Sequence, residues 1–243
     1  MHFQGILFDL GNTLLHFDGD TAEMIARADQ ALAESLSNSG LNINQAQFIR
    51  EFRYRLSTYH QVREEDLIEH TTRHILEQVL SDFGFTHVQE RIIQKGLKNL
   101  YHVSQNHWIP ENDTLTTLEA LQLRGCRMGI ISNAGDDADV QMLVDKAKIR
   151  PYFDFIITSA ACGYRKPDSK IFQHALGKWG FSAAQTAMVG DTLHADILGA
   201  NQAGIFSVWI TRRADRPDNN ANQARIKPNA AIETLAELPE LLD

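Results

Sequence analysis

The segment "GILFDLGNTL", residues 5–14, decides the fold class of this 243-residue chain. It is a short apolar run that ends in Asp9 and continues into a turn at Gly11 and Asn12. Near-continuous hydrophobicity over so few residues is typical of a strand in a parallel sheet that is covered on both faces. In open sheets of this kind, ligands bind outside the carboxyl ends of the strands. The segment therefore predicts a buried strand that delivers Asp9 to a binding site.

Strand and helix patterns alternate over the second half of the chain. Further apolar, β-rich runs lie at 127–132, 153–159, 186–191 and 206–210. The candidate helices are 112–124, 137–148, 168–179, 193–203 and 232–242. Such alternation is that of βαβ units, which build parallel sheets, so we predict a doubly wound, Rossmann-like α/β core. The polar stretch 212–229 is interpreted as a surface loop before the last helix.

A long insertion separates the first predicted strand from the second. Its apolar residues recur at helical spacing, as Phe48, Phe52 and Leu56 do. We predict an all-helical cap domain at 17–107, inserted into a core made of 1–16 and 108–243. Opening and closing of this cap about its two linkers, near 15–18 and 107–111, is a hypothesis that follows from the place of the insertion.

Composition narrows the class of partner. Hydrophobic residues make up 43% of the chain and charged residues 22%, as in an average globular protein. A formal net charge of -8 disfavours a nucleic-acid polymer or an anionic membrane, since both bind clustered Lys and Arg, but it allows a small anionic ligand. The chain shows no signal-peptide pattern and no apolar stretch near the roughly 20 residues of a membrane span. With only two cysteines, we predict a cytoplasmic location and leave the oligomeric state open.

Four reactive side chains follow the predicted strands or the turns after them. They are Asp9, Ser132, Lys166 and Asp191. An aspartate at a strand end is ordinarily a turn residue, and a lysine before proline is ordinarily solvated. Four such residues after four strands favour a common site instead, because the carboxyl ends of parallel strands share one edge of the sheet.

The chemistry of these four side chains points to phosphoryl transfer. Two carboxylates from neighbouring strand ends repel each other unless a cation lies between them, and hard oxygen ligands suit Mg²⁺. Ser132 can donate a hydrogen bond to a phosphoryl oxygen, and Lys166 can neutralise its charge. One carboxylate is then left to attack phosphorus and form an aspartyl-phosphate.

Four short motifs carry a family resemblance. They are "DLGNT" (9–13), "SN" (132–133), "KP" (166–167) and "GDTLHAD" (190–196). In this order they resemble the motifs of the haloacid dehalogenase superfamily, and they span nearly the whole predicted core. The helical insertion directly after the first motif is similar to the type 1 cap of subfamily I, which closes over the active site.

The resemblance implies a role for each motif residue. Asp9 would be the nucleophile and would ligate Mg²⁺ together with Asp191 and the backbone carbonyl of Gly11. Asp196 would steady Lys166 or a water on the metal. The residues that would bind the phosphoryl group are Ser132, Asn133, Lys166 and Thr13.

Gly11 departs from the family pattern, because most phosphatases of the family have an aspartate there that acts as general acid and base. Loss of such a group typically costs roughly 10²–10⁴ in rate. In one interpretation the chain is a phosphatase in which water, a cap residue or a neighbour such as His194 replaces the aspartate. In a second it is a metal-independent dehalogenase, although that branch does not usually carry the "GD" motif. In a third it binds phosphate and acts as a regulator with weak turnover.

The expected partner is a small phosphorylated metabolite. The stretch "VGDTLHADILGANQAGIFSVWI" is similar to nucleotidase-like and flavin-phosphate-phosphatase-like members of the family, which favours a nucleotide, flavin or sugar phosphate. In the predicted cap, residues 50–63 combine arginines with Tyr59 and His60, and such a face can hold a phosphorylated ligand. The same arginines are equally placed to pair with nearby glutamates. No cap residue is therefore assigned to the site.

Overall fold

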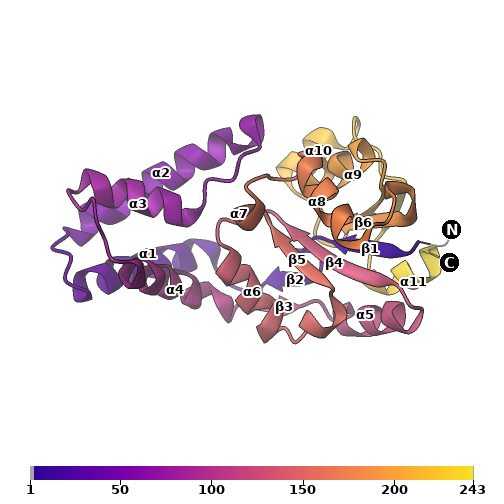
Figure 1. The fold of residues 1–243 in the computed structure, drawn as a ribbon, viewed down its shortest axis with the longest axis horizontal. Coiled ribbons are helices and arrows are strands. Elements are labelled where there is room, and N and C mark those ends of the chain that lie inside the picture. Colours follow the sequence, from indigo (N-terminus) through magenta and orange to yellow (C-terminus); the bar gives the residue numbers. More distant parts are fainter. Residues whose placement is uncertain (1–2, 243) are drawn as a thin grey trace.

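The computed structural model describes residues 3–242, and a six-stranded parallel sheet forms its core (Figure 1). The strands, in spatial order, are β5 (Phe155–Thr158), β4 (Arg127–Ser132), β1 (Gly5–Phe8), β6 (Thr186–Gly190), β7 (Phe206–Ile210) and β8 (Ala230–Ile232). Because β1 pairs with both β4 and β6, the carboxyl ends of these three strands lie side by side. The predicted doubly wound α/β fold is confirmed.

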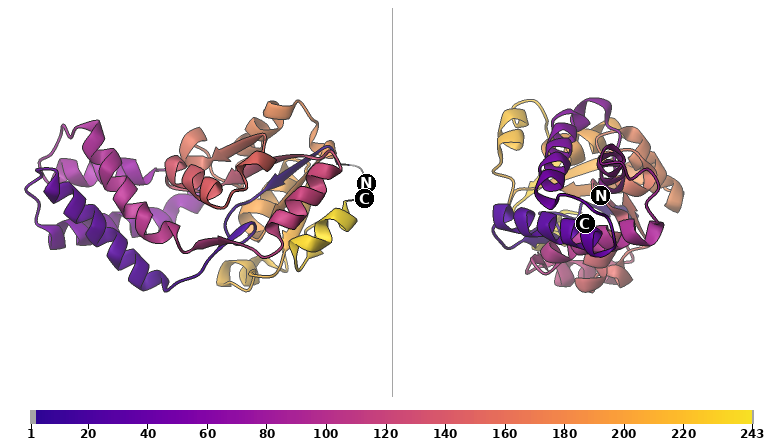
Figure 2. Two further views of the ribbon diagram at one scale, coloured as in Figure 1. Left: turned by 90° about the horizontal axis from the view of Figure 1, so that it is seen from below. Right: turned by 90° about the vertical axis from the view of Figure 1, so that its left-hand side faces the viewer.

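Alternating side chains of the strands point to opposite faces of the sheet, and helices cover both faces (Figures 1 and 2). Ile6 and Phe8 pack in one cluster with α5 (Thr114–Leu123), α6 (Asp137–Lys146) and α11 (Leu238–Leu241). Leu7 packs in another with α8 (Ser169–Trp179) and α9 (Gly199–Gln202). The shorter elements are α7 (Ser159–Cys162), α10 (Pro217–Asn222), the 3₁₀ turns Arg150–Tyr152, Ala183–Gln185 and Leu235–Glu237, and the π-helical turn Leu193–Leu198.

Four helices form a second body beside the sheet, and we call them the cap (Figure 2). They are α1 (Thr21–Asn38), α2 (Gln45–Asp66), α3 (Thr72–Asp82) and α4 (Glu90–Gln105). Asp20, Asn44 and Thr71 begin the first three, because each side chain accepts a hydrogen bond from a backbone N–H of the first turn. The four helices enclose a hydrophobic cluster of their own. The domain boundary at 17 and 107 stays a prediction.

A two-stranded antiparallel ribbon connects the cap to the core. It consists of β2 (Leu15–Phe17) and β3 (Trp108–Pro110), so the chain enters and leaves the cap at one place. The Phe17 and Trp108 rings lie edge to face across it, 5.6 Å between centroids. Both predicted linkers fall on this ribbon, and movement of the cap about it stays a hypothesis.

The loop between α2 and α3, together with the first residue of α3, also connects the cap to the core. We call this segment, residues 67–72, the latch. Three backbone hydrogen bonds cross from this loop to core segments. They join Arg165 N to Leu67 O at 2.9 Å, Glu69 N to Gly163 O at 3.0 Å and Thr72 N to Gly135 O at 2.9 Å.

The latch also carries a buried ion pair. Glu69 and Arg165 form a salt bridge with side chains that are only 1% and 4% exposed. The second partner of the Glu69 carboxylate is Ser159, whose hydroxyl donates to it at 2.6 Å. Removing one member of a buried pair leaves the other charge without compensation, so the pair holds the cap in this position.

Two of the predicted segments differ in detail. The helix predicted at 232–242 is wrong at its start, because residues 230–232 form β8 beside β7, and α11 begins only at Leu238 with Pro239 in its first turn. A three-residue strand is too short to show a period in the sequence. The loop predicted at 212–229 contains the short helix α10. None of the helices in residues 3–242 has both the length and the apolarity that a membrane span requires.

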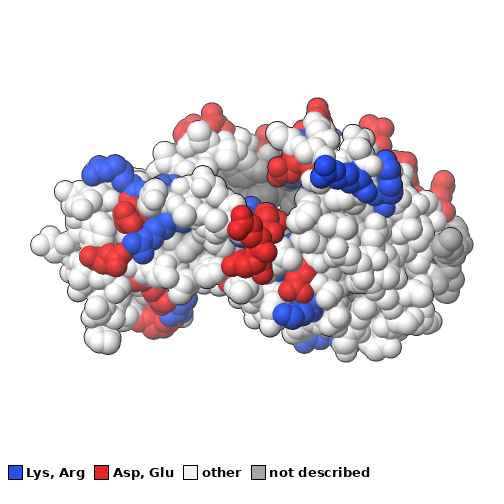
Figure 3. Space-filling model, turned by 90° about the horizontal axis from the view of Figure 1, so that it is seen from above, with Lys and Arg blue, Asp and Glu red and all other residues white. Residues whose placement is uncertain are grey.

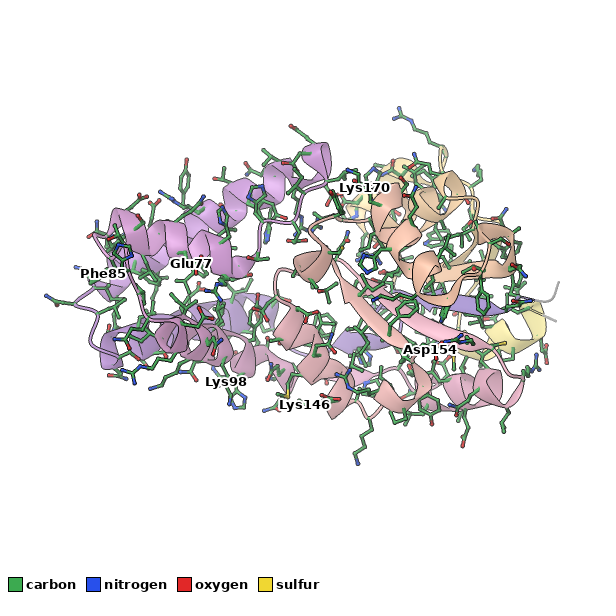
Figure 4. The ribbon with its side chains drawn as sticks, viewed as in Figure 1. Glu77, Phe85, Lys98, Lys146, Asp154 and Lys170 are labelled. Carbon is green, nitrogen blue, oxygen red and sulfur yellow. The ribbon has the colours of Figure 1, made fainter. Side chains whose placement is uncertain are left out.

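We expect Glu69→Ala to lower the free energy of unfolding by about 3–5 kcal/mol, because it leaves the buried Arg165 guanidinium with only its longer contact to Glu64, at 3.4 Å. Glu77→Ala is the matched control, since Glu77 lies on the cap and pairs with Arg73 at an exposed site (Figure 4). Its effect should not exceed about 1 kcal/mol. Urea denaturation followed by circular dichroism measures both. Equal losses in the two variants would show that the latch pair does not stabilise the closed arrangement.

Candidate active site

Three carboxylates meet at the carboxyl ends of the central strands. Asp9 follows β1, Asp191 follows β6, and Asp196 lies in the π-helical turn after it. One oxygen of each lies within 4.8 Å of the others. Asp191 and Asp196 are buried, and the side chain of Asp9 is 13% exposed. The predicted approach of Asp9 to Asp191 is therefore present in the structure.

Lys166 lies inside this group of acids. Its ammonium donates to Asp9 Oδ1 at 2.7 Å, to Asp196 Oδ1 at 2.6 Å and to the carbonyl of Ile131 at 2.8 Å. The second oxygen of Asp196 accepts from the backbone N–H of Thr192 at 2.9 Å. Asp196 is therefore bonded on one side to Lys166 and on the other to the chain after β6, and all three acids offer an oxygen to the same small space.

Asn133 holds the backbone of Lys166. Its amide nitrogen donates to Lys166 O at 2.9 Å, and its amide oxygen accepts from Lys166 N at 2.8 Å. These two bonds hold the Asn133 side chain against the backbone of Lys166. Binding of the phosphoryl group by Asn133 stays a prediction.

Gly190 is required by the close approach of Asp196. A Cβ at residue 190 would lie 2.3 Å from Asp196 Cγ, which no relaxed side chain could tolerate. In the "GD" pair, the first residue therefore has to be glycine for steric reasons. The aspartate of the pair ends the strand, and the glycine makes room for the acid that reaches back toward Lys166.

The remaining predicted residues lie on the same edge of the sheet. Ser132 ends β4 and lines the active-site cavity. Thr13 is completely buried, and its hydroxyl has no hydrogen-bond partner among residues 3–242. Asn12 has a φ of 55°, a left-handed conformation that asparagine tolerates better than most residues. This conformation lets the chain turn back directly after Gly11.

Burial and mutual repulsion alter the charge state of the acids. Burial raises the pKa of Asp9 to about 6, against the opposing attraction of Lys166. Burial, together with Asp9 and Asp196, raises the pKa of Asp191 to about 8. Burial opposes the charge of Lys166, but Asp196 and Asp9 outweigh it and raise its pKa. The converging carboxylate oxygens of these acids are the donors that a hard divalent cation prefers. A bound cation would also relieve the repulsion between the carboxylates.

Comparison with known proteins agrees with this geometry. The family model of haloacid dehalogenase-like hydrolases matches residues 3–204. The chain belongs to this family. It is 25% identical, over 98% of its length and 99% of the relative's, to glyceraldehyde 3-phosphate phosphatase of Methanothermobacter thermautotrophicus. It is 35% identical to the pyrimidine 5'-nucleotidase YjjG of Escherichia coli over 49% of this chain and 52% of the relative.

The solved structures that resemble this chain include a dehalogenase. The 2-haloacid dehalogenase of Pseudomonas syringae pv. Tomato DC3000 is 27% identical, with a TM-score of 0.68 over 99% of this chain and 98% of the other. The chain is thus a haloacid dehalogenase-like hydrolase, and one relative that it matches over nearly its full length is a phosphatase. Family likeness alone leaves the bond that it cleaves to be argued from the site.

Arg216 is a member of the site that the sequence did not reveal. Its guanidinium forms an ion pair with Asp191 and donates to Thr192 Oγ1 at 3.0 Å, and its side chain is 38% exposed. It belongs to the stretch interpreted as a surface loop, and no local pattern distinguishes it from Arg212 and Arg213 beside it. A cation thus already accompanies the acid that is expected to bind metal.

Trp108 occupies the surroundings of Gly11 in this hydrolase. A Cβ at residue 11 would lie 3.5 Å from the nearest atom of the Trp108 ring, which is ordinary van der Waals contact. The position where relatives carry an acid therefore faces the carbon surface of an indole. Trp108 is distant in sequence and reaches the site through the ribbon.

A cavity of about 790 Å³ lies over these residues, between cap and core (Figure 3). The cap contributes His60, Arg63 and Glu64 to its lining. Glu64 lies 3.5 Å from His194 Nδ1 of the core, and this contact raises the pKa of His194. His194, considered from sequence as a substitute acid, is therefore held at the cavity with its positive form favoured.

Asp139 generates a prediction about pH, because it also lines this cavity. Burial raises its pKa to about 6, although Gln105 donates to it at 2.8 Å. A carboxyl whose pKa is higher in the folded state than in the unfolded state destabilises the fold as it ionises, between about pH 4 and pH 6. We expect Asp139→Asn to be more stable than wild type by about 1–2 kcal/mol at pH 8, with a difference that shrinks toward pH 4.

Urea denaturation over a pH series measures this difference. Asp145→Asn is the control with opposite sign, since Arg150 lowers the pKa of the exposed Asp145 by a hydrogen bond. That variant should be no more stable than wild type at pH 8. A gain for Asp139→Asn that did not change with pH would contradict an electrostatic origin.

Proposed function

We propose that this chain is a Mg²⁺-dependent phosphomonoester hydrolase that forms an aspartyl-phosphate on Asp9. The observation that carries the proposal is the position of the Lys166 ammonium, 2.7 Å from Asp9 and enclosed by the acids of two strand ends. A carboxylate held by a cation at the mouth of a polar cavity is arranged for attack on an anionic phosphoryl group. Its full-length likeness to a phosphatase supports the same chemistry.

Asp9, Asp191 and the backbone carbonyl of Gly11 are the proposed ligands of the metal. A bound divalent cation supplies neutralisation of the phosphoryl charge and orients the phosphoryl group toward Asp9. The oxygen donors and their burial suit Mg²⁺. Asp196 is proposed to act on Lys166, because its Oδ1 accepts from the Lys166 ammonium at 2.6 Å.

The residues of the chain divide the remaining work. Asp9 is ionised at neutral pH, since its pKa lies near 6, and its oxygen attacks phosphorus as the ester oxygen departs. Lys166, with Ser132 and Thr13, is proposed to hold the phosphoryl oxygens. Water then cleaves the aspartyl-phosphate and restores the Asp9 carboxylate.

The acid that Gly11 lacks is proposed to be replaced in part by the His194 and Glu64 pair. The imidazolium of His194 lines the cavity and is favoured by the neighbouring carboxylate. The substrate is proposed to be a small phosphorylated metabolite, of the nucleotide, flavin or sugar-phosphate kind, and the location to be the cytoplasm. The relatives named above act on glyceraldehyde 3-phosphate and on pyrimidine nucleotides, as their names state.

Phosphate release from a panel of phosphomonoesters with Mg²⁺ tests the proposal. We expect wild type to release phosphate, EDTA to abolish release, and Asp9→Asn to lower kcat by at least about 10³, since the nucleophile is lost. Binding of phosphate without release by wild type would favour a regulator. Chloride release from 2-chloropropionate in the presence of EDTA would show a dehalogenase.

Arg216→Gln should tighten the binding of Mn²⁺ to the metal-free protein. Arg216 pairs with Asp191, so an incoming cation has to displace it. We expect the Kd measured by calorimetry to fall by roughly tenfold, which corresponds to about 1.4 kcal/mol. Arg213→Gln is the control, because Arg213 pairs with Glu111 outside the site. An unchanged or weaker Kd in Arg216→Gln would show that Arg216 does not compete with the metal.

A further inference from the structure

A second cavity, of about 480 Å³, lies between the cap helices and the ribbon, and we call it the cap chamber. Its volume is within the range of pockets that hold small ligands. The apolar and aromatic residues of its lining are Phe17, Met24, Ile25, Ala28, Leu56, Tyr59, Leu100, Tyr101 and Trp108. Sequence patterns did not indicate this chamber, because its walls come from all four cap helices, the latch and both strands of the ribbon.

The chamber adjoins the active-site cavity. Asn12, His60, Arg63 and Trp108 line both spaces, and we call these four residues the junction. A ligand whose phosphoryl group lay at Asp9 would have room to extend past the junction into the chamber. Its ester oxygen would then lie close to the junction.

Most polar groups deep in the chamber wall are bonded within the protein. Tyr59 donates its hydroxyl to Glu69 at 2.8 Å, and the Tyr101 and Thr72 hydroxyls are 2.6 Å apart. Arg53 forms a bidentate ion pair with Asp29. Arg63 Nε, at the junction, is a buried donor without a hydrogen-bond partner among residues 3–242. A sugar would find few further partners beyond the junction, and burying an unpaired polar group is costly. The wall instead offers carbon surface to an apolar or aromatic body.

The junction supplies no carboxyl group to the departing oxygen. Residue 11 has no side chain, and the Trp108 ring is the surface that faces it. Burial and the charges of Arg63, Arg165 and Arg53 lower the pKa of His60 to about 4, so its ring is neutral at pH 7 and has no imidazolium proton to donate. His194 lines the active-site cavity but not the chamber. A leaving group that departs as an anion suits these surroundings.

We propose that the substrates of this site are aryl phosphates: phosphate esters of a phenol whose ring contacts Trp108 and whose body fills the cap chamber. This proposal rests on the proposed phosphatase function. A bond forms between an Asp9 carboxylate oxygen and phosphorus, the bond from phosphorus to the aryl oxygen breaks, and the phenolate leaves with the electron pair and takes a proton from solvent. Phenols have a pKa of about 10, as tyrosine does, so a phenolate leaves far more readily than an alkoxide.

A comparison of three phosphate esters distinguishes the effect of the leaving group on the rate from the effect of the substrate's aromatic body. Phenyl phosphate and benzyl phosphate share an aromatic body, but only the first has a phenolic oxygen, and glycerol 3-phosphate has neither. We expect kcat/KM with Mg²⁺ to favour phenyl over benzyl phosphate by on the order of 10², the size of a missing general acid. Benzyl phosphate should in turn exceed glycerol 3-phosphate by roughly tenfold, because of its body. Equal or reversed values would overturn the proposal.

Gly11→Asp tests the leaving-group half of the proposal. Its Cβ has room beside Trp108, and its carboxyl can supply the missing proton. We expect the ratio of phenyl to benzyl phosphate turnover to fall at least tenfold, because the poorer leaving group gains more. A ratio that stays constant while the variant remains folded and active would show that protonation does not set the preference.

Ile25→Asp tests the chamber half. Ile25 lies in the chamber wall and is 41% exposed, so the fold tolerates a charge there, whereas Leu123→Asp, at an 85% exposed position of α5, is the matched control. We expect Ile25→Asp to weaken the binding of phenyl phosphate to an Asp9→Asn background at least fivefold by calorimetry, and Leu123→Asp to change nothing. Equal binding in both would place the aromatic body elsewhere.

The two levels of proposal fail in different ways. If wild type releases phosphate from none of these three esters and from no other member of the phosphomonoester panel, the phosphatase function fails. If it releases phosphate from glycerol 3-phosphate as fast as from phenyl phosphate, the phosphatase stands and the aryl phosphate class is overturned.

Discussion

The buried ammonium of Lys166 is the interaction on which the rest of the site depends. It is 1% exposed and lies between Asp9 and Asp196, which come from segments at the ends of different strands. The buried positive charge of Lys166 is stabilised only while Asp9 and Asp196 are ionised. Without the lysine, the two carboxylates are close enough to repel each other. Asn133, the first residue after β4, holds the backbone of Lys166, and the absence of a side chain at Gly190 leaves space for Asp196. The order of the strands brings the two acids to Lys166, and the charge of Lys166 in turn stabilises the acids at this edge of the sheet.

The cap is fixed to this core by two very different connections. The ribbon is a short backbone pairing that contains Phe17 and Trp108, whereas the latch contains the buried pair of Glu69 and Arg165. Arg165 directly precedes Lys166 in the chain, so the latch holds the loop that carries Lys166. An opening of the cap that separated residues 67–72 from the core would expose this pair and loosen the Lys166 loop. The position of the cap and the position of Lys166 are therefore linked through adjacent residues.

The sequence was sufficient for features that are local, and insufficient for those that depend on distant segments. The strands at 127–132 and 206–210 were predicted to the residue, because apolar runs bounded by polar turns are a local pattern. The positions of Asp9 and Asp191 followed from the rule for strand ends. The strand at 230–232 was missed since three residues show no period. Arg216 was missed because its contact with Asp191 depends on how a long polar loop returns to the sheet.

Trp108 links the connection of the cap to the chemistry at Gly11. It is the first residue of β3, it pairs with Phe17 across the ribbon, and its ring is the surface that a side chain at position 11 would meet. Gly11 therefore does not only lack a carboxyl group. The space that a side chain at residue 11 would enter borders the apolar ring of Trp108, which belongs to the ribbon. Rotation of the ribbon would move the indole relative to Gly11 and the junction. The connection of the cap to the core and the surroundings of Gly11 thus share one side chain.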